Sequence, residues 1–357
     1  MSLSKEEQAN LLRRHGVTVP EKIELSEDVE DNSHEAILKI WKDIKAYNNM
    51  LKKKLTLIND SMTKAFPLAE GNLYLFCAYT GSGKSTVAAN IAYPLWRQEK
   101  KVLYISNEEP KQDVLFRIAA LHLGYDFNEW KRGKMPESQQ LECMKLIPII
   151  NKFVVVKDLL WKDGLTTKLE GVQALLEWIK GKNYSCVLID YYQLIKDSIN
   201  DKGKTRFEIL NDFRLWLGRY IKDSEVPVCL FVQLHSIGKR GGVKDIDHRI
   251  KECTTIIEPA ALIFEIAPNY DNYTSDFIVH KDRFDRAGVK ITLPLDHGRF
   301  NNHLSEQELK ARTERIAKLR AEKDLEGLLK TVNVEGIEEE DEDEQFSGAD
   351  YIAGQKI

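Results

Sequence analysis

The chain has 357 residues, and its hydrophobic content of 43% and charged content of 30% are those of a globular protein with one large domain or two ordinary ones. No apolar run approaches the roughly 18 residues of a membrane span, and the polar first residues exclude a cleavable signal peptide. The net charge of −4 is unevenly distributed, because residues 338–344 are all acidic and leave 49 of the 56 Asp and Glu against 52 Lys and Arg.

Residues 1–66 are predicted to be a helical N-terminal extension with linkers. Within it, residues 34–55 carry apolar side chains at three- and four-residue spacing, the pattern of an amphipathic helix. These side chains are Ile37, Ile40, Trp41, Ile44, Tyr47 and Leu51. The stripe could pack on the chain's own core or on a neighbouring subunit, and the pattern does not choose between the two.

Residues 67–300 alternate short apolar runs with longer helical patterns. Strands are expected near 73–78, 102–106, 153–157, 186–190, 227–232, 261–267, 276–280 and 289–293. Helices are expected near 85–97, 110–123, 137–148, 166–180 and 205–223. The alternation predicts an α/β fold with a mainly parallel twisted sheet flanked by helices, in which the last strands finish as hairpins.

The C-terminal part is predicted to be a helix followed by an acidic tail. The helix, within residues 301–331, begins at a capping box formed by Ser305 and Glu308, and charges surround it almost completely. Residues 332–357 have the composition of a disordered, solvated segment. The tail could instead dock a partner or compete with nucleic acid for a basic channel.

The five cysteines are odd in number and lack the spacing of metal ligands. They are Cys77, Cys143, Cys186, Cys229 and Cys253. The first, third and fourth lie in apolar strand-like runs, where cysteine usually acts as a small buried hydrophobic side chain. The sequence therefore predicts a reduced cytoplasmic protein without zinc or structural disulfides.

A glycine-rich turn lies between the first predicted strand and the helix that follows it. It consists of Ala78, Tyr79, Thr80, Gly81, Ser82, Gly83, Lys84, Ser85 and Thr86. Such a turn aims backbone N–H groups and the positive end of the helix at one point, which predicts a site for nucleotide phosphates. The Lys84 amine would reach the β- and γ-phosphates of ATP or another nucleoside triphosphate, and the Ser85 hydroxyl would bind Mg²⁺. Ala78 stands where the P-loop pattern has glycine, and a small residue is enough there.

Polar residues at the ends of three other predicted strands complete this site. Asp190 ends an apolar strand, as the Mg²⁺-holding Walker B aspartate does. Of Glu108 and Glu109, which follow another strand, one could orient and deprotonate the attacking water, or both could lie in the first turn of a helix. Gln233 ends a third strand and could sense the γ-phosphate.

Several of these residues belong to longer motifs that occur in a fixed order. They are Ser106-Asn-Glu-Glu-Pro110, Ile189-Asp-Tyr-Tyr-Gln-Leu194, Val226-Pro-Val with Gln233-Leu234, Lys251-Glu252-Cys-Thr-Thr-Ile256, Lys281-Asp-Arg283 and Gly298-Arg-Phe300. Over about residues 65–300 this set resembles the RecA-like motor domain of replicative hexameric helicases of the DnaB type and of phage primase-helicases. The resemblance makes Glu108 the counterpart of the family's catalytic glutamate.

The resemblance also implies a role for Arg283 and Lys281. In this family such a pair is supplied to the ATP of the neighbouring subunit, where Arg283 would act as an arginine finger and Lys281 would assist. Taken alone, the segment would be an ordinary charged strand end, and Arg286 is a weaker reserve candidate for the finger.

Two segments are predicted to contact single-stranded DNA in the central channel of the ring. Residues 196–205 follow Asp190 closely, and residues 236–244 follow Gln233. The resemblance extends the second segment to further residues, so that the predicted DNA-binding set is Lys239, Arg240, Lys251, Glu252 and Thr254. No aromatic residues interleave, so the contacts would be to phosphates and indifferent to sequence. The alternative is a pair of ordinary surface loops.

The predicted function is an ATP-dependent helicase that moves on single-stranded DNA in replication. The resemblance implies assembly into a hexameric ring and 5′→3′ polarity. The short segment 1–66 leaves no room for a primase, so a separate primase or loader is expected, in the host cytoplasm if the protein is phage-encoded. The alternative is an ATP-gated DNA-binding protein, recombinase-like or a scaffold, without unwinding activity. A phosphotransferase acting on a small substrate is a third hypothesis.

Overall fold

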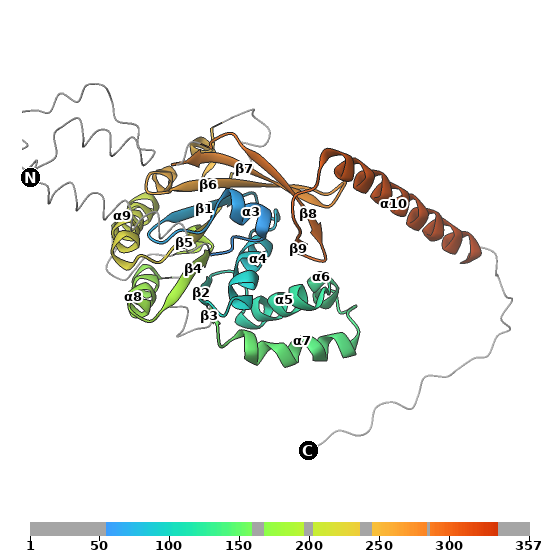
Figure 1. Cartoon of the computed structure of the whole chain (residues 1–357), viewed down its shortest axis with the longest axis horizontal. Coiled ribbons are helices and arrows are strands. Elements are labelled where there is room, and N and C mark those ends of the chain that lie inside the picture. Colours follow the sequence, from blue (N-terminus) through green and yellow to red (C-terminus); the bar gives the residue numbers. More distant parts are fainter. Residues whose placement is uncertain (1–54, 159–167, 196–202, 236–244, 284–285, 335–357) are drawn as a thin grey trace, which may run out of the picture. The chain divides into compact units, whose positions relative to one another are not determined.

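The structure is a computed structural model that describes residues 55–158, 168–195, 203–235, 245–283 and 286–334 (Figure 1). The predicted amphipathic stripe at 34–55, the tail beyond residue 334, and Lys239 and Arg240 lie outside the described residues, apart from Leu55 itself. The chain divides into two compact units, Met1–Pro268 with Thr274–His303, and Asn269–Tyr273 with Leu304–Ile357.

The main unit is built on a nine-stranded sheet with the order β3-β2-β4-β5-β1-β6-β7-β8-β9. Its strands are β1 Leu73–Ala78, β2 Lys101–Ser106, β3 Val154–Lys157, β4 Tyr184–Asp190, β5 Val228–Gln233, β6 Leu262–Asn269, β7 Thr274–Asp282, β8 Lys290–Asp296 and β9 Arg299–Phe300. The pairings of β1 with β5 and β6, of β2 with β3 and β4, and of β4 with β5 are parallel. Strands β7, β8 and β9 pair antiparallel, which confirms the predicted mainly parallel sheet with terminal hairpins.

Helices cover both faces of the parallel part of the sheet (Figure 1). Within the described residues, the α-helices of the main unit are α3 Asp60–Ala65, α4 Lys84–Arg97, α5 Lys111–Leu123, α6 Phe127–Lys131, α7 Glu137–Ile150, α8 Leu169–Ile179 and α9 Arg206–Ser224. Helices α4, α5 and α7 pack on one face, with strand residues such as Phe76 and Leu188. Helices α8 and α9 pack on the other face, with Leu75 and Ile189. Neighbouring residues of a strand thus enter different cores, because strand side chains alternate between faces.

Burial on both faces explains why these strands are continuous apolar runs rather than alternating ones. All six residues of β1 are buried, and so are five of the six in β5. The five cysteines are free and buried, which confirms the predicted burial of Cys77, Cys186 and Cys229. Among the described residues, no helix has the length and apolar character that crossing a membrane requires.

Each strand and helix predicted within residues 67–300 has a counterpart within a few residues, but several short elements, among them α6 and β9, were not predicted. Helix α6 and strand β9 are too short to produce a periodic pattern, so sequence periodicity could not reveal them. The helix predicted at 166–180 begins at Leu169, and residues 159–167 lie outside the described part of the chain.

The second unit contains α10 Glu306–Val334, which begins at the predicted capping box. The backbone N–H of Ser305 donates to Glu308 Oε2 over 2.8 Å, and the Glu308 N–H donates to Ser305 Oγ over 3.3 Å. Within this unit, Arg312 Nε donates to the carbonyl of Asn272 over 3.0 Å. The guanidinium of Arg320 lies over the ring of Tyr273, 5.3 Å from its centroid.

Candidate nucleotide-binding site

The glycine-rich turn between β1 and α4 has the backbone shape of a phosphate-binding loop. Gly81 has φ +75° and Gly83 has φ +84°, in the left-handed region that favours glycine. A Cβ on Gly81 would meet no atom within 4 Å, so the backbone angle rather than space requires glycine there. Helix α4 has no side-chain cap and no acidic residue in its first turn, which leaves its positive end for an anion.

Lys84, the first residue of α4, is buried. Its Nζ lies 5.0 Å from the centroid of the Tyr191 ring. Burial lowers the pKa of Lys84, while the negative charges of Asp190 and Glu108 raise it. The ammonium group is therefore held in a partly desolvated position beside two carboxylates, where its attraction to phosphate oxygens is stronger than in water.

Asp190 ends β4 as predicted and is 1% exposed. Burial raises the pKa of its carboxyl group to about 6, and Ser85 and Lys84 oppose this shift. Its Oδ2 accepts a hydrogen bond from the Tyr104 hydroxyl over 3.1 Å, whereas its buried Oδ1 has no hydrogen-bond partner among the described residues. An unpaired carboxylate oxygen next to a serine hydroxyl suits Mg²⁺, which prefers oxygen ligands.

The structure gives the two neighbouring glutamates different surroundings. Glu109 forms an ion pair with Arg117 of α5, and its backbone N–H bonds Ser106 Oγ over 3.1 Å. Glu108 is exposed. Apart from burial, the charges of both glutamates raise the pKa of Asp190, and the charge of Glu108 also raises that of Tyr191. Both glutamates therefore lie near Asp190, but Glu109 is bound to Arg117 of α5, whereas Glu108 is exposed.

Gln233, the last residue of β5, is bonded directly to the phosphate-binding loop. It lies opposite Ala78 in the parallel register, and Leu234 N–H donates to the carbonyl of Ala78 over 2.9 Å. The Gln233 side chain donates from Nε2 to Thr80 Oγ1 over 2.8 Å. A shift in the position of the loop would therefore also move the end of β5, because these bonds join the two.

Arg283 and Lys281 lie near the amino-terminal ends of the parallel strands, opposite the phosphate-binding loop. The Arg283 N–H donates to the carbonyl of Ala261, immediately before β6, whose carboxyl end lies with that of β1. Arg283 Nη2 donates to the carbonyl of Pro259 over 3.1 Å, and Lys281 Nζ donates to that of Ile257 over 2.8 Å. At roughly 3.3 Å per residue, the length of β6 separates Arg283 from this chain's own Lys84.

Arg286, the reserve candidate, is used within the fold. Its Nε pairs with Asp282 Oδ2 over 2.6 Å, and its guanidinium lies 4.5 Å from the centroid of the Phe66 ring. It also donates to the carbonyl of Ala65. These contacts join Arg286 to the end of β7 and to the end of α3, so we do not assign Arg286 to the finger.

Of the predicted DNA-binding residues, Lys251, Glu252 and Thr254 are described. Lys251 and Glu252 precede the short helix η5 Thr254–Ile257, in which Thr254 is exposed. The Glu252 carboxylate accepts from Arg206 Nε over 2.9 Å, so it is occupied by an intramolecular ion pair. Lys251 is half-exposed, with its Nζ 3.9 Å from Glu252 Oε1.

Sequence reasoning missed a buried ionic cluster beside the loop. Arg249 forms two bonds with Glu265 of β6, 2.7 Å and 2.6 Å long, and His280 of β7 bonds the same carboxylate over 2.7 Å. Burial opposes ionisation of Glu265, but these bonds outweigh it and lower its pKa to about 2. Arg249 also reaches the Tyr79 hydroxyl over 3.4 Å. The three residues are far apart in sequence, and no local spacing could have identified them.

The fold and this site define a RecA-like P-loop domain. Residues 55–302 match the family described as the DnaB-like helicase C-terminal domain, and the chain belongs to that family. No curated protein matches the sequence.

The solved structures that are similar in fold include the following two. One is an ATPase domain that is 17% identical, with a TM-score of 0.61, and the match covers 77% of this chain and all of that domain. The other is a DnaB-like replicative helicase, whose structure is described together with its interactions with primase. It is also 17% identical, with a TM-score of 0.60 over 84% of this chain and 72% of that one.

Proposed function

We propose that the protein is an ATP-driven helicase that translocates on single-stranded DNA as a ring of identical subunits. One observation carries the proposal. Lys84, Asp190 and Gln233 meet at the carboxyl ends of adjacent parallel strands, whereas Arg283 lies at the opposite edge of the sheet. A nucleotide site that is nearly complete in one chain would thus be completed by the arginine of another.

In this proposal the phosphate-binding loop and Lys84 bind the triphosphate. The backbone N–H groups at the start of α4 and the Lys84 ammonium neutralise phosphate charge. Ser85 and Asp190 would hold Mg²⁺, which when bound stabilises the charge that develops during phosphoryl transfer. Tyr104 orients the Asp190 carboxylate through their hydrogen bond.

Glu108 would orient the attacking water and accept its proton. It is the acidic residue of its pair that is left exposed beside Lys84, because Glu109 is bound to Arg117. Gln233 would respond to the γ-phosphate through its contact with Thr80 of the loop. Arg283 of the adjacent subunit, with Lys281, would stabilise the transferring phosphoryl group, a contribution worth about 10³–10⁵ in turnover.

DNA would be held through phosphate contacts, which are independent of base sequence and weaken with salt. Lys251, together with Lys239 and Arg240, supplies the positive charge, and Thr254 supplies an exposed hydroxyl. We include in the proposal a hexameric ring, 5′→3′ movement in replication and a separate primase or loader, all of which are supported by membership of the family.

The test measures ATP turnover with and without oligo-dT, together with strand separation on a forked substrate. Wild-type protein is expected to be stimulated by DNA and to unwind the fork, whereas Lys84→Ala should do neither. Turnover that ignores DNA would overturn the proposal. DNA-stimulated turnover without strand separation would support the ATP-gated binding protein instead.

A further inference from the structure

A buried glutamine joins the γ-phosphate sensor to the DNA-side segment. Gln193, in the short helix η2 Tyr192–Leu194 after β4, is 7% exposed. Its Nε2 donates to the carbonyl of Gln233 over 3.0 Å and to that of Lys251 over 3.1 Å. Its Oε1 accepts from the N–H of Gln233 over 3.0 Å. One side chain thus fixes both backbone groups of Gln233 and also the residue that carries a predicted phosphate contact.

The backbone on both sides of Gln233 reinforces this connection. Lys251 N–H donates to the carbonyl of Gln233 over 3.2 Å, and His235 N–H donates to that of Arg249 over 2.8 Å. Leu234 and Ile250 form an antiparallel bridge. Residues 233–235, which leave β5, and residues 249–251, which lead to η5, therefore lie side by side. We call this two-stranded segment the neck.

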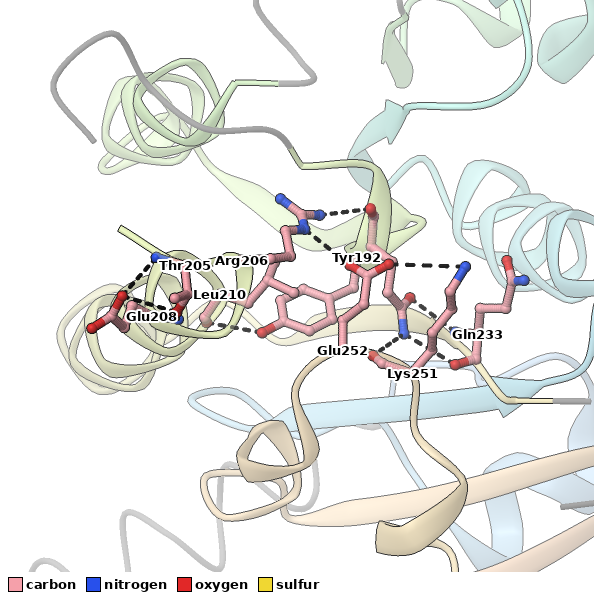
Figure 2. Close-up of polar contacts among 9 residues, drawn as sticks. Tyr192, Thr205, Arg206, Glu208, Leu210, Gln233, Lys251 and Glu252 are labelled. Atoms are coloured by element: carbon pink, nitrogen blue, oxygen red, sulfur yellow. Dashed lines mark hydrogen bonds and ion pairs between the residues drawn. The ribbon is translucent and has the colours of Figure 1, made fainter. Parts of the chain in front are cut away.

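An ion pair ties the start of α9 to the same neck (Figure 2). Arg206 Nη2 donates to the carbonyl of Gln193 over 2.7 Å, and Arg206 Nε donates to Glu252 over 2.9 Å. Arg206 is held in place because Thr205 and Glu208 form a capping box at the start of α9. Glu252 has φ +71°, in the left-handed region that residues other than glycine adopt infrequently.

We propose that Gln193, Arg206 and Glu252 form a coupling clamp that makes the Lys251–Glu252 segment move together with Gln233. Gln193 is a positioning residue: it acts through Gln233 and Lys251. Because Gln233 is bonded to Thr80, the clamp offers a continuous path from the phosphate-binding loop to the DNA-side segment. The inference rests on the proposed function and specifies how its two sites communicate.

The main test replaces Gln193 by Met, which has a similar length but forms no hydrogen bonds. ATP turnover is measured with and without saturating oligo-dT. We expect the KM for ATP and the turnover without DNA to stay within about twofold of wild type, while stimulation by DNA falls at least about fivefold, the lower range of allosteric coupling. Unchanged stimulation in Gln193→Met would overturn the clamp.

A second measurement uses the mutual effect of ATP and DNA on each other's affinity, which a purely structural role of Gln193 would leave unchanged. If ATP and DNA sites are coupled, each ligand changes the affinity for the other by the same factor. The ratio of Kd values for labelled oligo-dT, with ADP and with a nonhydrolysable ATP analogue, should therefore approach one in Gln193→Met. A ratio equal to that of wild type would contradict the proposal.

Arg206→Lys tests the clamp at its partly exposed edge, and it serves if Gln193→Met does not fold. Lysine keeps the charge but cannot donate in parallel to Gln193 and Glu252. Arg214→Lys is the matched control, because Arg214 also joins α9 to the segment after the neck, through Glu258, but does not contact Gln193. Equal loss of coupling in both variants would show that the clamp has no special role.

The outcomes separate the two proposals. A wild-type protein whose turnover ignores DNA would overturn the helicase function and the clamp together. A wild-type protein that is stimulated by DNA, with Gln193→Met and Arg206→Lys stimulated equally, would overturn the clamp alone.

Discussion

The two ends of the parallel strands, which form two opposite edges of the sheet, carry polar groups that differ in burial and in hydrogen bonding. At the carboxyl ends of β1, β4 and β5, Lys84 and Asp190 are buried, and Asp190 Oδ1 has no hydrogen-bond partner among the described residues. At the other edge, Lys281 and Arg283 donate to backbone carbonyls and Arg283 is exposed. The first edge is organised within one chain. The second presents an exposed cation that the length of β6 separates from the phosphate-binding loop of its own chain.

Among the variants that test this comparison, Arg283→Ala is expected to have the largest effect. Turnover in the assembled protein should fall by about 10³–10⁵, because the developing phosphoryl charge loses its stabilising cation. ATP affinity should change little, since the phosphate-binding loop is intact. Steady-state hydrolysis and binding of a fluorescent ATP analogue would measure both, with Lys290→Ala as an exposed-cation control.

Mixing variants tests whether the arginine acts between subunits. An Arg283→Ala subunit keeps its phosphate-binding loop, and a Lys84→Ala subunit keeps its arginine, so a mixed assembly contains some complete sites. Turnover should recover on mixing. Two inactive preparations that stay inactive together would argue against a shared site.

Within the first edge, Glu108 and Glu109 are expected to respond differently to the same substitution. Glu108→Gln should lower turnover about 10²–10⁴-fold, the usual worth of a general base. Glu109→Gln should instead lower the free energy of unfolding by about 1–3 kcal/mol, because it weakens a partly buried bond to Arg117. Hydrolysis rates and thermal unfolding of both variants would distinguish the roles, and the reverse pattern would exchange them.

The smallest expected effect concerns the burial of Asp190. Its pKa is raised from 3.8 to about 6, so between these values the folded chain holds a proton that the unfolded chain has released. The carboxylate is therefore destabilising above pH 6, by up to about 3 kcal/mol, and this cost disappears as the pH falls toward 4. Without Mg²⁺, Asp190→Asn should be more stable than wild type at pH 7.5 and nearly equal to it at pH 4.5. Denaturant unfolding at both pH values measures the difference, and a gap independent of pH would contradict this account.

Much of the fold could be predicted because its signals are local. The runs that form β1, β4 and β5 are apolar throughout, and the helices between them show clear periodicity. Boundaries were less certain: α8 begins at Leu169 rather than near 166, and β9 is too short to be seen. In the site, Lys84 could be located because it ends a glycine-rich turn at the start of a helix, and Asp190 because it ends an apolar strand.

The sequence by itself determined the phosphate-binding loop and the strands and helices that flank it along the chain, because glycine angles and apolar runs act over a few neighbouring residues. Only the tertiary structure decided that Glu109 pairs with Arg117, and that Gln193 binds Gln233 and Lys251. It also brought Arg249, Glu265 and His280 together. These contacts join residues that are distant along the chain, so their partners are set by how strands and helices pack and not by any local pattern.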